Sequence, residues 1–304
     1  MNALSLDLEF WYSAELLKPY VPAHAEDKLL ESVEPILVLL DRWDTRATFF
    51  VVGDVAAKYP NLVRDLDARG HEVASHGYSH TRLHDLGEDG FREDLRRSGD
   101  VIEGITGRRP IGFRAPSFSL DRSTSWALLA LKEQGYRYDS SIFPMKTPLY
   151  GVAGAPRFPY NPALADITRH DATQELWEFP VAVWKAGLRI PVGGAFYLRV
   201  LPAWFVAWAI KRINAQDQPA VLYLHPWETC GQVPRLRDAS LFAQFVSYWG
   251  RQGVLGKLEY LLRRLKFGPM RDLLVRHGCA SCASREAHAF TGRQSRGRAR
   301  SSAR

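Results

Sequence analysis

Two histidines in the segment His71–His80 are spaced for joint binding of a metal ion. The segment reads HEVASHGYSH, and His76 and His80 stand four positions apart. On a helical turn, positions i and i+4 lie on one face, so both imidazoles can reach a single ion. Two loop histidines without a shared role are the alternative, because such pairs are not rare. A carboxylate ligand nearby would favour the metal site.

Two carboxylates near the start of the chain could supply that ligand. Asp7 and Glu9 alternate at the end of a strand-like apolar run, so both side chains point to the same face. A solvated strand end is one explanation of this pair. In the functional alternative, one carboxylate binds the metal and the other transfers a proton. Two histidines and one carboxylate leave positions for water and substrate, which suits hydrolysis.

Strands alternate with helices along most of the chain, which predicts an α/β fold with a parallel sheet, either open or closed into a barrel. Strand-like runs occupy residues 3–10, 47–52, 71–75, 112–115 and 220–224. Helical spacing of apolar residues marks residues 25–43, 61–69, 90–106, 123–134, 201–215, 240–252 and 254–265. The candidate residues follow strand ends, where the active sites of barrel enzymes lie. Residues 144–195 are rich in Pro and Gly and are expected to form loops with short strands.

Five short elements, in this order, resemble the polysaccharide deacetylases with the NodB homology domain, carbohydrate esterase family 4. They are Asp7-Leu-Glu9, His76-x-x-x-His80, Arg114-Ala-Pro116, Asp139-Ser140 and Leu222-Tyr-Leu-His225. The resemblance covers about residues 3–230. Each element alone is weak, and the specificity lies in the order and spacing of all five.

A closer resemblance is to the branch found in exopolysaccharide loci associated with PEP-CTERM systems. That branch begins with D-V-E and carries a GGG-Y-F-R-like segment and an H-P-W-E motif. Here these segments read Asp7-Leu-Glu9, Gly193-Gly-Ala-Phe-Tyr-Leu-Arg199 and His225-Pro-Trp-Glu228. The resemblance therefore implies a role in exopolysaccharide biosynthesis.

The family implies a distorted (β/α)7-type barrel that binds a divalent metal ion, most simply Zn²⁺. The implied reaction is hydrolysis of the N-acetyl group of an amino sugar in a polysaccharide, an oligosaccharide or a lipid-linked glycan precursor. By this resemblance the metal ligands are Glu9, His76 and His80. The ion and a backbone N–H would stabilise the tetrahedral oxyanion.

The same resemblance assigns the proton transfers. Asp7 is the general base that takes a proton from the water on the ion, and His225 is the general acid that protonates the leaving amine. Arg114 would hold Asp7 ionised and oriented. Asp139 would pair with His225 and keep the imidazolium charged.

The chain departs from the common family pattern in its first motif. Position 8 is Leu where the family has a second Asp, and the acidic partner is Glu9. Because Glu9 shares a face with Asp7, the ligand role survives, although the longer side chain places the ion differently. Gly77 replaces the usual hydroxyl residue, and Ala195 stands where a third Gly is expected.

Substrate contacts are assigned to Trp11, Pro116, Tyr197 and Trp227, which lie in or beside these motifs. Aromatic rings suit the faces of sugars, and core filling is the alternative for each of them. Two other functions stay open. One is a cyclic amide or ureide hydrolase of the same fold, and the other is a non-catalytic glycan-binding protein with a decayed site.

Charge divides the chain of 304 residues unevenly. Residues 285–304 hold six arginines and one glutamate, against a net charge of +7 for the whole chain. We expect a catalytic domain at 1–255, a basic amphipathic helical extension at 256–284 and a disordered Arg-rich tail at 285–304. The extension either packs on its own barrel or makes peripheral contact with an anionic membrane. No nucleic-acid partner is expected.

Three cysteines, Cys230, Cys279 and Cys282, are too few for a disulfide framework, and the Cys279–Cys282 pair supplies only half of a structural zinc site. No signal peptide is visible, because acidic residues occur from position 7 onward. The expected location is the cytoplasm, or the inner face of the membrane. The oligomeric state is not predicted.

Overall fold

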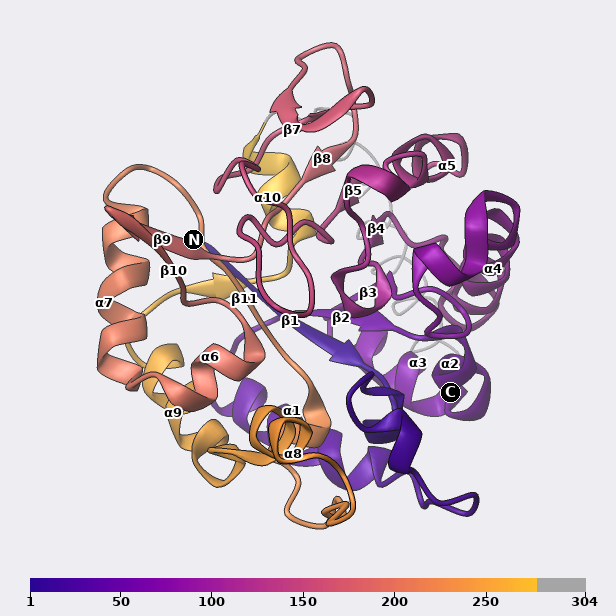
Figure 1. The fold of residues 1–304 in the computed structure, drawn as a ribbon, viewed down its shortest axis with the longest axis vertical. Coiled ribbons are helices and arrows are strands. Elements are labelled where there is room, and N and C mark those ends of the chain that lie inside the picture. The colour runs from indigo at the N-terminus through magenta and orange to yellow at the C-terminus, as the bar shows by residue number, and fades with distance from the viewer. Residues whose placement is uncertain (278–304) are drawn as a thin grey trace, which may run out of the picture.

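A curled sheet of parallel strands forms the centre of the protein (Figure 1). The computed structural model describes residues 1–277. The strands along the sheet follow the order β11-β1-β2-β3-β4-β5-β8, and every neighbouring pair is parallel. Their bounds are β1 Asn2–Leu8, β2 Thr48–Val51, β3 Glu72–Ser75, β4 Gly112–Phe113, β5 Tyr138–Asp139, β8 Trp177–Glu178 and β11 Val221–Leu224. The predicted α/β class is confirmed, and the sheet curls into a half-barrel.

Strand β1 lies between β11 and β2, and all seven of its residues are buried. It pairs with β11 through Ala3–Leu6 and with β2 through Ser5–Leu8. Its alternation of Leu with Ser and Asp puts Leu4, Leu6 and Leu8 into the apolar core between sheet and helices. The polar residues point into the curl of the sheet, which is where a buried polar site can be built.

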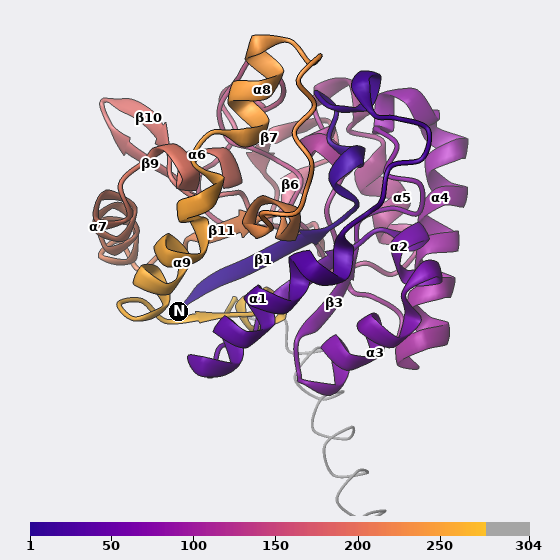
Figure 2. The same cartoon turned by 90° about the horizontal axis from the view of Figure 1, so that it is seen from below.

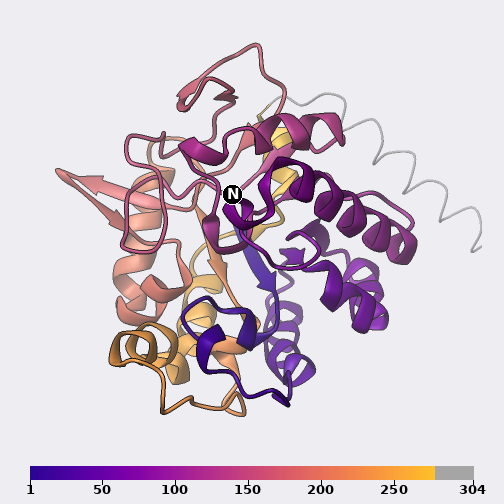
Figure 3. The same cartoon turned by 45° about the vertical axis from the view of Figure 1, so that its right-hand side comes forward.

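Helices cover the outside of the sheet (Figures 2 and 3). Their bounds are α1 Leu29–Arg42, α2 Gly53–Lys58, α3 Pro60–Ala68, α4 Leu83–Thr106, α5 Ala127–Glu133, α6 Ala195–Val200, α7 Ala203–Asn214, α8 Leu241–Tyr248, α9 Val254–Leu262 and α10 Arg271–Arg276. In Figure 3 the purple helices of the N-terminal half stand in a row on one side of the sheet. No helix of residues 1–277 is long and apolar enough to cross a membrane.

The segment after β5 contains more regular structure than its composition predicts. It forms two hairpins, β6 Pro162–Ala163 with β7 Asp166–His170 and β9 Val183–Ala186 with β10 Leu188–Pro191. It also contains α6, which begins directly after the glycines at 193 and 194. These elements are too short for a hydrophobic period to reveal them.

The chain after α8 returns to the sheet. In α9, Leu258 and Leu261 are fully buried, and the Nζ of Lys257 donates to the carbonyls of Leu198, Arg199 and Leu201 at 2.6–3.0 Å. Strand β12, Phe267–Gly268, then pairs with the start of β1. Packing on its own barrel is therefore what the described part of this segment does. Residues 278–304, which include Cys279, Cys282 and the Arg-rich tail, lie outside the described residues.

Backbone hydrogen bonds reach the free edge of β11 from the segment between β8 and α6. Ala182 N donates to Val221 O at 2.9 Å, and Tyr223 N donates to Gly193 O at 2.8 Å. A Cβ at position 193 would lie 2.2 Å from Val221 O and 2.7 Å from Ala182 N. Only glycine therefore permits this approach of two backbones.

We predict that Gly193→Ala lowers the free energy of unfolding by about 2 kcal/mol or more, because backbone atoms must move apart. Gly194→Ala is the matched control, since its Cβ would meet only side chains, the nearest atom being in Tyr197 at 3.0 Å. Urea unfolding of both variants measures the difference. Equal losses would show that the approach at position 193 is not a constraint.

Candidate metal-dependent active site

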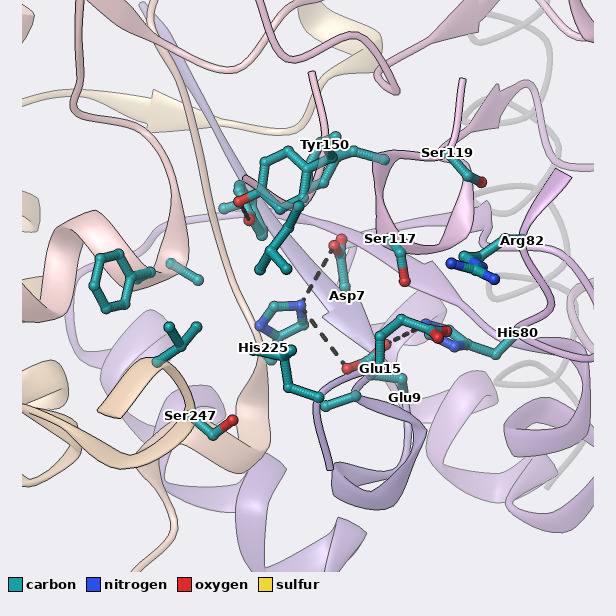
Figure 4. A pocket seen from close by; sticks show the side chains of 18 of the residues that line it. Asp7, Glu9, Glu15, His80, Arg82, Ser117, Ser119, Tyr150, His225 and Ser247 are labelled. Atoms are coloured by element: carbon teal, nitrogen blue, oxygen red, sulfur yellow. Dashed lines mark hydrogen bonds and ion pairs between the residues drawn. The ribbon is translucent and has the colours of Figure 1, made fainter. Parts of the chain in front are cut away.

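The carboxyl ends of β1, β3, β4 and β11 meet at one cleft, of about 290 Å³ (Figure 4). Asp7 lies near the end of β1, and Glu9 follows that strand. His76 follows β3, Arg114 follows β4 and His225 follows β11. Parallel strands end on the same side of a sheet, so residues far apart in the sequence converge here.

Glu9, His76 and His80 form the one group of potential metal ligands found in residues 1–277. Each offers one ligand atom, and these atoms lie within 4.8 Å of one another. Glu9 Oε2 is 2.5 Å from His80 Nε2 and 4.0 Å from His76 Nε2. All three side chains are buried. Two imidazoles and a carboxylate are a ligand set that zinc and similar divalent ions accept.

The hydrogen bonds of the two histidines fit a shared ion. His76 Nδ1 lies 2.7 Å from the carbonyl oxygen of Arg114, which fixes the ring and leaves Nε2 for a ligand bond. His80 Nε2 faces Glu9 Oε2 at 2.5 Å, while its other ring nitrogen, Nδ1, is buried and has no hydrogen-bond partner within the described chain. An orphaned buried nitrogen is costly unless something else satisfies it. A metal ion at this position would do so.

Protonation favours the same interpretation. Burial lowers the pKa of His76 to about 4, so its imidazole is neutral at about pH 7, as a metal ligand must be. Burial alone would raise the pKa of Glu9, but His80 and His225 outweigh it and hold that pKa well below its ordinary value. The carboxylate is therefore ionised and ready to bind a cation.

The loop that carries the histidines is shaped by Asp94 of α4. Its carboxylate accepts from the backbone N–H groups of Tyr78 and Ser79 at 2.6 and 3.0 Å. Gly77 and His80 have positive φ values of 72° and 53°. Gly77 adopts this conformation without strain, which explains why a glycine stands where the family has a hydroxyl residue. His80 is held in it by the loop.

Asp7 is paired with a fully buried guanidinium. Arg114 Nη1 donates to Asp7 Oδ1 at 2.6 Å and to Ser5 Oγ at 3.0 Å, while its other nitrogens donate to the carbonyl and hydroxyl of Ser140. The pairing of Arg114 with Asp7 that the resemblance implies is thus present in the structure. The second oxygen of Asp7 faces His225, at 3.9 Å from Nε2.

His225 lies among three carboxylates at the mouth of the cleft (Figure 4). Its Nε2 is 3.9 Å from both Asp7 and Glu9, and its Nδ1 is 3.4 Å from Glu228 Oε2. Burial disfavours the imidazolium, but these carboxylates outweigh it and raise the pKa of His225 to about 9. Its side chain is 20% exposed, so a substrate can reach it.

Glu228 is the partner of His225 that the sequence did not assign. Its carboxylate is buried, and Arg199 Nε lies 2.9 Å from its Oε1. Burial alone would raise the pKa of Glu228, but Arg199 and His225 keep it below its ordinary value. Both residues belong to motifs noted in the sequence, the H-P-W-E motif and the glycine-rich segment. The motif was visible, but the contact between its first and last residues was not.

Asp139 does not contact His225, in contrast to the role that the resemblance implies. It is buried at the end of β5, where it accepts a hydrogen bond from Ser141 and lies beside Glu178 of β8. Burial raises the pKa of both carboxyls, and Asp139 raises that of Glu178 further. The pair therefore holds a proton more tightly than two free carboxyls would. It anchors the turn after β5, since Glu178 Oε1 accepts from Ile142 N at 3.0 Å.

Of the four residues that the sequence assigns to substrate contact, only Trp227 lines the cleft. Trp227 lines the cleft, stacks on His225 with ring centroids 5.6 Å apart, and donates from Nε1 to Glu9 Oε1 at 3.1 Å. Trp11 is fully buried, and its indole donates to the carbonyl of Glu26, so core filling is its role in this structure. Pro116 and Tyr197 are not among the residues that line the cleft, but their sequence neighbours Ser117 and Phe196 are.

The cleft has a polar arm and an apolar arm on either side of His225 (Figure 4). The polar arm, on the His80 side, is lined by Glu15, Arg82, His84, Ser117, Ser119 and Asp121. The apolar arm, on the Ser247 side, is lined by Phe196 and Val246, whereas Tyr150 lies across His225 from Ser247 (Figure 4). Hydroxyls and charges suit the polar groups of a sugar, while the apolar arm suits a less polar substituent.

Comparisons with known proteins agree with the site. Residues 25–138 match the polysaccharide deacetylase family, and residues 140–275 match a domain of unknown function (DUF3473). The chain is similar to the peptidoglycan-N-acetylglucosamine deacetylase of Bacillus cereus, with 32% identity over 99 residues, or 32% of this chain and 36% of that protein. The matched segment spans little more than a third of the length of the curated relatives.

Solved structures share the fold. A probable polysaccharide deacetylase from Pseudomonas aeruginosa PAO1 has a TM-score of 0.57 at 17% identity, covering 89% of this chain and 88% of that one. PuuE allantoinase has a TM-score of 0.54 at 17% identity, covering 88% and 85%. Identities this low establish the shared fold and leave the reaction to be argued from the site.

The Asp139–Glu178 pair predicts a pH dependence of stability. A carboxyl with a raised pKa binds its proton more tightly in the folded protein than in the unfolded chain. Rising pH therefore lowers the free energy of unfolding above the ordinary carboxyl pKa of about 4. Glu178→Gln has no proton to lose there, so we expect a smaller decline between about pH 5 and about pH 8.

Urea unfolding at several pH values measures this decline. Glu175→Gln is the control, because Glu175 is exposed and lies only three residues before Glu178. A Glu178→Gln variant whose decline matches that of the wild type would mean that the pair does not hold a proton.

Proposed function

Because this chain belongs to the polysaccharide deacetylase family through its NodB-type domain (carbohydrate esterase family 4), we propose that it is a metal-dependent hydrolase of N-acetylated amino sugars. The single observation that carries the proposal is the buried group Glu9, His76 and His80, which lines the cleft together with Asp7. A divalent ion held by these three residues, most simply Zn²⁺, would supply a Lewis acid for the amide carbonyl.

Asp7 is the proposed general base. Its Oδ1 is occupied by Arg114, while Oδ2 faces the cleft beside His225. Because the guanidinium takes up Oδ1, Oδ2 is left to accept a proton from the attacking water. Because Arg114 is also bound to Ser5 and Ser140, it fixes the direction in which that oxygen points.

His225 is the proposed general acid. The raised pKa keeps its ring protonated at about pH 7, and its Nε2 faces the same space as Asp7 Oδ2. It can therefore protonate the amine nitrogen as the carbon–nitrogen bond breaks. Glu228, held by Arg199, orients the ring through Nδ1 and takes the place that the resemblance gives to Asp139.

More specifically, the proposed substrate is an exopolysaccharide or a lipid-linked glycan precursor, and the proposed reaction takes place in the cytoplasm. The H-P-W-E and glycine-rich motifs support this choice, because the structure joins them through the Arg199–Glu228–His225 contacts. A cyclic amide or ureide hydrolase is the second candidate, since the same fold serves an allantoinase. The family matched by residues 25–138 and the long polar arm of the cleft favour the glycan.

Acetate release tests the proposed function. Purified zinc-loaded protein should release acetate from N-acetylglucosamine oligomers, and His76→Ala should lower the rate at least about a thousandfold, since a ligand to the Lewis acid is lost. His24→Ala is the control, because His24 is exposed. Acetate release from no member of a broad glycan panel, with turnover of a ureide instead, would favour the second candidate. Zinc binding without any turnover would favour a glycan-binding protein.

Metal binding and proton transfer can be separated by two further variants. Glu9→Ala should lower zinc affinity about a hundredfold or more, because it removes a ligand. Glu228→Gln should keep stoichiometric zinc but lower kcat about a hundredfold, because the ring of His225 loses its charged partner. Zinc titration and steady-state kinetics on both variants measure this contrast. Loss of zinc from Glu228→Gln would place Glu228 in the metal site instead.

A further inference from the structure

Helix α8 carries an apolar face that no described residue covers. Ala243, Ser247 and Tyr248 point inward and are buried. On the outer face, Leu241 is 84% exposed and Trp249, just after the helix, is 61% exposed, with Phe242 and Phe245 exposed between them. Residues 239–250 contain no charged side chain. A surface helix normally turns polar residues outward, so an apolar outer face marks an interaction surface.

This face begins at the rim of the proposed active site. Val246 and Ser247 of α8 line the cleft, and so does Phe196 of α6, whose ring lies 5.7 Å from that of Phe245. In Figure 2, α8 rises above the sheet next to α6. A molecule that covers α8 would therefore lie beside the apolar arm of the cleft.

Further exposed apolar side chains lie on α7, which follows α6 in the chain, and on the β9–β10 hairpin. The end of α8 lies against the end of α6, where Arg199 Nη1 donates to Trp249 O at 2.8 Å. Helix α7 begins at Ala203, and its second residue, Trp204, is 62% exposed; Trp208, one turn later, is also exposed. Trp208 contacts Trp184 of the hairpin, whose turn exposes Leu188 to 78%. We call these exposed residues the α8–α7 surface: Leu241, Phe242, Phe245, Trp249, Trp204, Trp208 and Leu188.

The exposed charges of α7 and the β9–β10 hairpin have one sign, and just before α8 the exposed Arg235 and Arg237 outnumber the exposed Asp238. From Phe179 to Gln216 the chain contains no Asp or Glu, while Lys185, Lys211 and Arg212 are exposed. Tryptophan and phenylalanine suit the boundary between lipid headgroups and acyl chains, and lysine and arginine attract anionic headgroups. A second copy of this surface would instead bring the cationic side chains of α7 and the β9–β10 hairpin against one another.

We propose that the α8–α7 surface docks on an anionic lipid bilayer and holds the mouth of the cleft at the membrane surface. The inference rests on the proposed function only for the substrate, which it narrows to a glycan anchored in that membrane by a lipid. The sugar would enter the polar arm, and the lipid-proximal end would lie along the apolar arm and α8. The proposed docking surface thus belongs to the described barrel and does not include the Arg-rich tail.

Vesicle sedimentation of the full chain tests the docking. Wild-type protein should pellet with vesicles of phosphatidylcholine and phosphatidylglycerol, and more weakly with phosphatidylcholine alone. The double variant Phe242→Ser/Trp249→Ser should bind at least about tenfold more weakly, because two interfacial rings are lost. Leu30→Ser/Val38→Ser is the matched control, since both residues are exposed apolar side chains of α1.

Charge reversal gives a second variant that leaves the apolar residues in place. Lys185→Glu/Lys211→Glu/Arg212→Glu should lower binding to vesicles with phosphatidylglycerol more than binding to phosphatidylcholine alone. All variants keep the tail. Pelleting of both variants like the wild type would overturn the proposal and assign binding to another part of the chain. A wild-type dimer that Phe242→Ser/Trp249→Ser dissociates, with vesicle binding unchanged, would also overturn it.

Activity on a soluble oligomer separates the two proposals. Phe242→Ser/Trp249→Ser should release acetate from soluble N-acetylglucosamine oligomers at the wild-type rate, because the substituted residues lie outside the catalytic group. A wild type that binds vesicles but hydrolyses no glycan would refute the proposed function and leave the docking intact. A wild type that hydrolyses soluble glycans but binds no vesicle would refute the docking and leave the proposed function intact.

Discussion

One buried guanidinium holds the active end of the sheet together. Arg114 is fully buried and donates to Asp7 and Ser5 of β1 and to Ser140 after β5. The Cζ atom of Arg114 lies 4.2 Å from the ring centroid of Phe50 in β2 and 5.2 Å from that of Tyr223 in β11. One side chain therefore touches four strands or their ends. A buried cation is tolerated only when its hydrogen bonds are made and a counter-charge is present, and here Asp7 is that counter-charge.

This requirement ties catalysis to the fold. Asp7 neutralises the guanidinium through one oxygen and leaves the other facing the cleft, so the proposed base cannot be removed without leaving a charge buried and unpaired. The neighbouring position shows the same division of roles. Leu8 points into the apolar core, where an aspartate would be buried without a partner, so the second carboxylate comes two residues after Asp7, at Glu9. In this chain the two carboxylates therefore lie on the same face of the extended segment.

The parts of the site that the sequence predicted are those fixed by local spacing. The buried strands β1, β2 and β11 and the long helices α1 and α7 have clear periods, and Glu9, His76 and His80 follow from strand ends and a short loop. The proposed partner of His225 could not be predicted in this way. Asp139 and Glu228 both lie near strand ends, and the choice between them depends on where α6 places Arg199. That helix has six residues, too few for a recognisable period.

Arg199 also connects the two proposals physically. Its Nε lies beside Glu228, while its other nitrogens donate to the carbonyls of Val246 and Trp249 at the end of α8. Carbonyls at a helix end carry partial negative charge, so a buried arginine there stabilises the helix as well as the carboxylate. The ring of His225 and the apolar face of α8 are therefore held by the same side chain. A displacement of α8 by a bound bilayer would shift Arg199 and Glu228, and with them the proton donor, whereas the metal ligands on the opposite side of the cleft would stay in place.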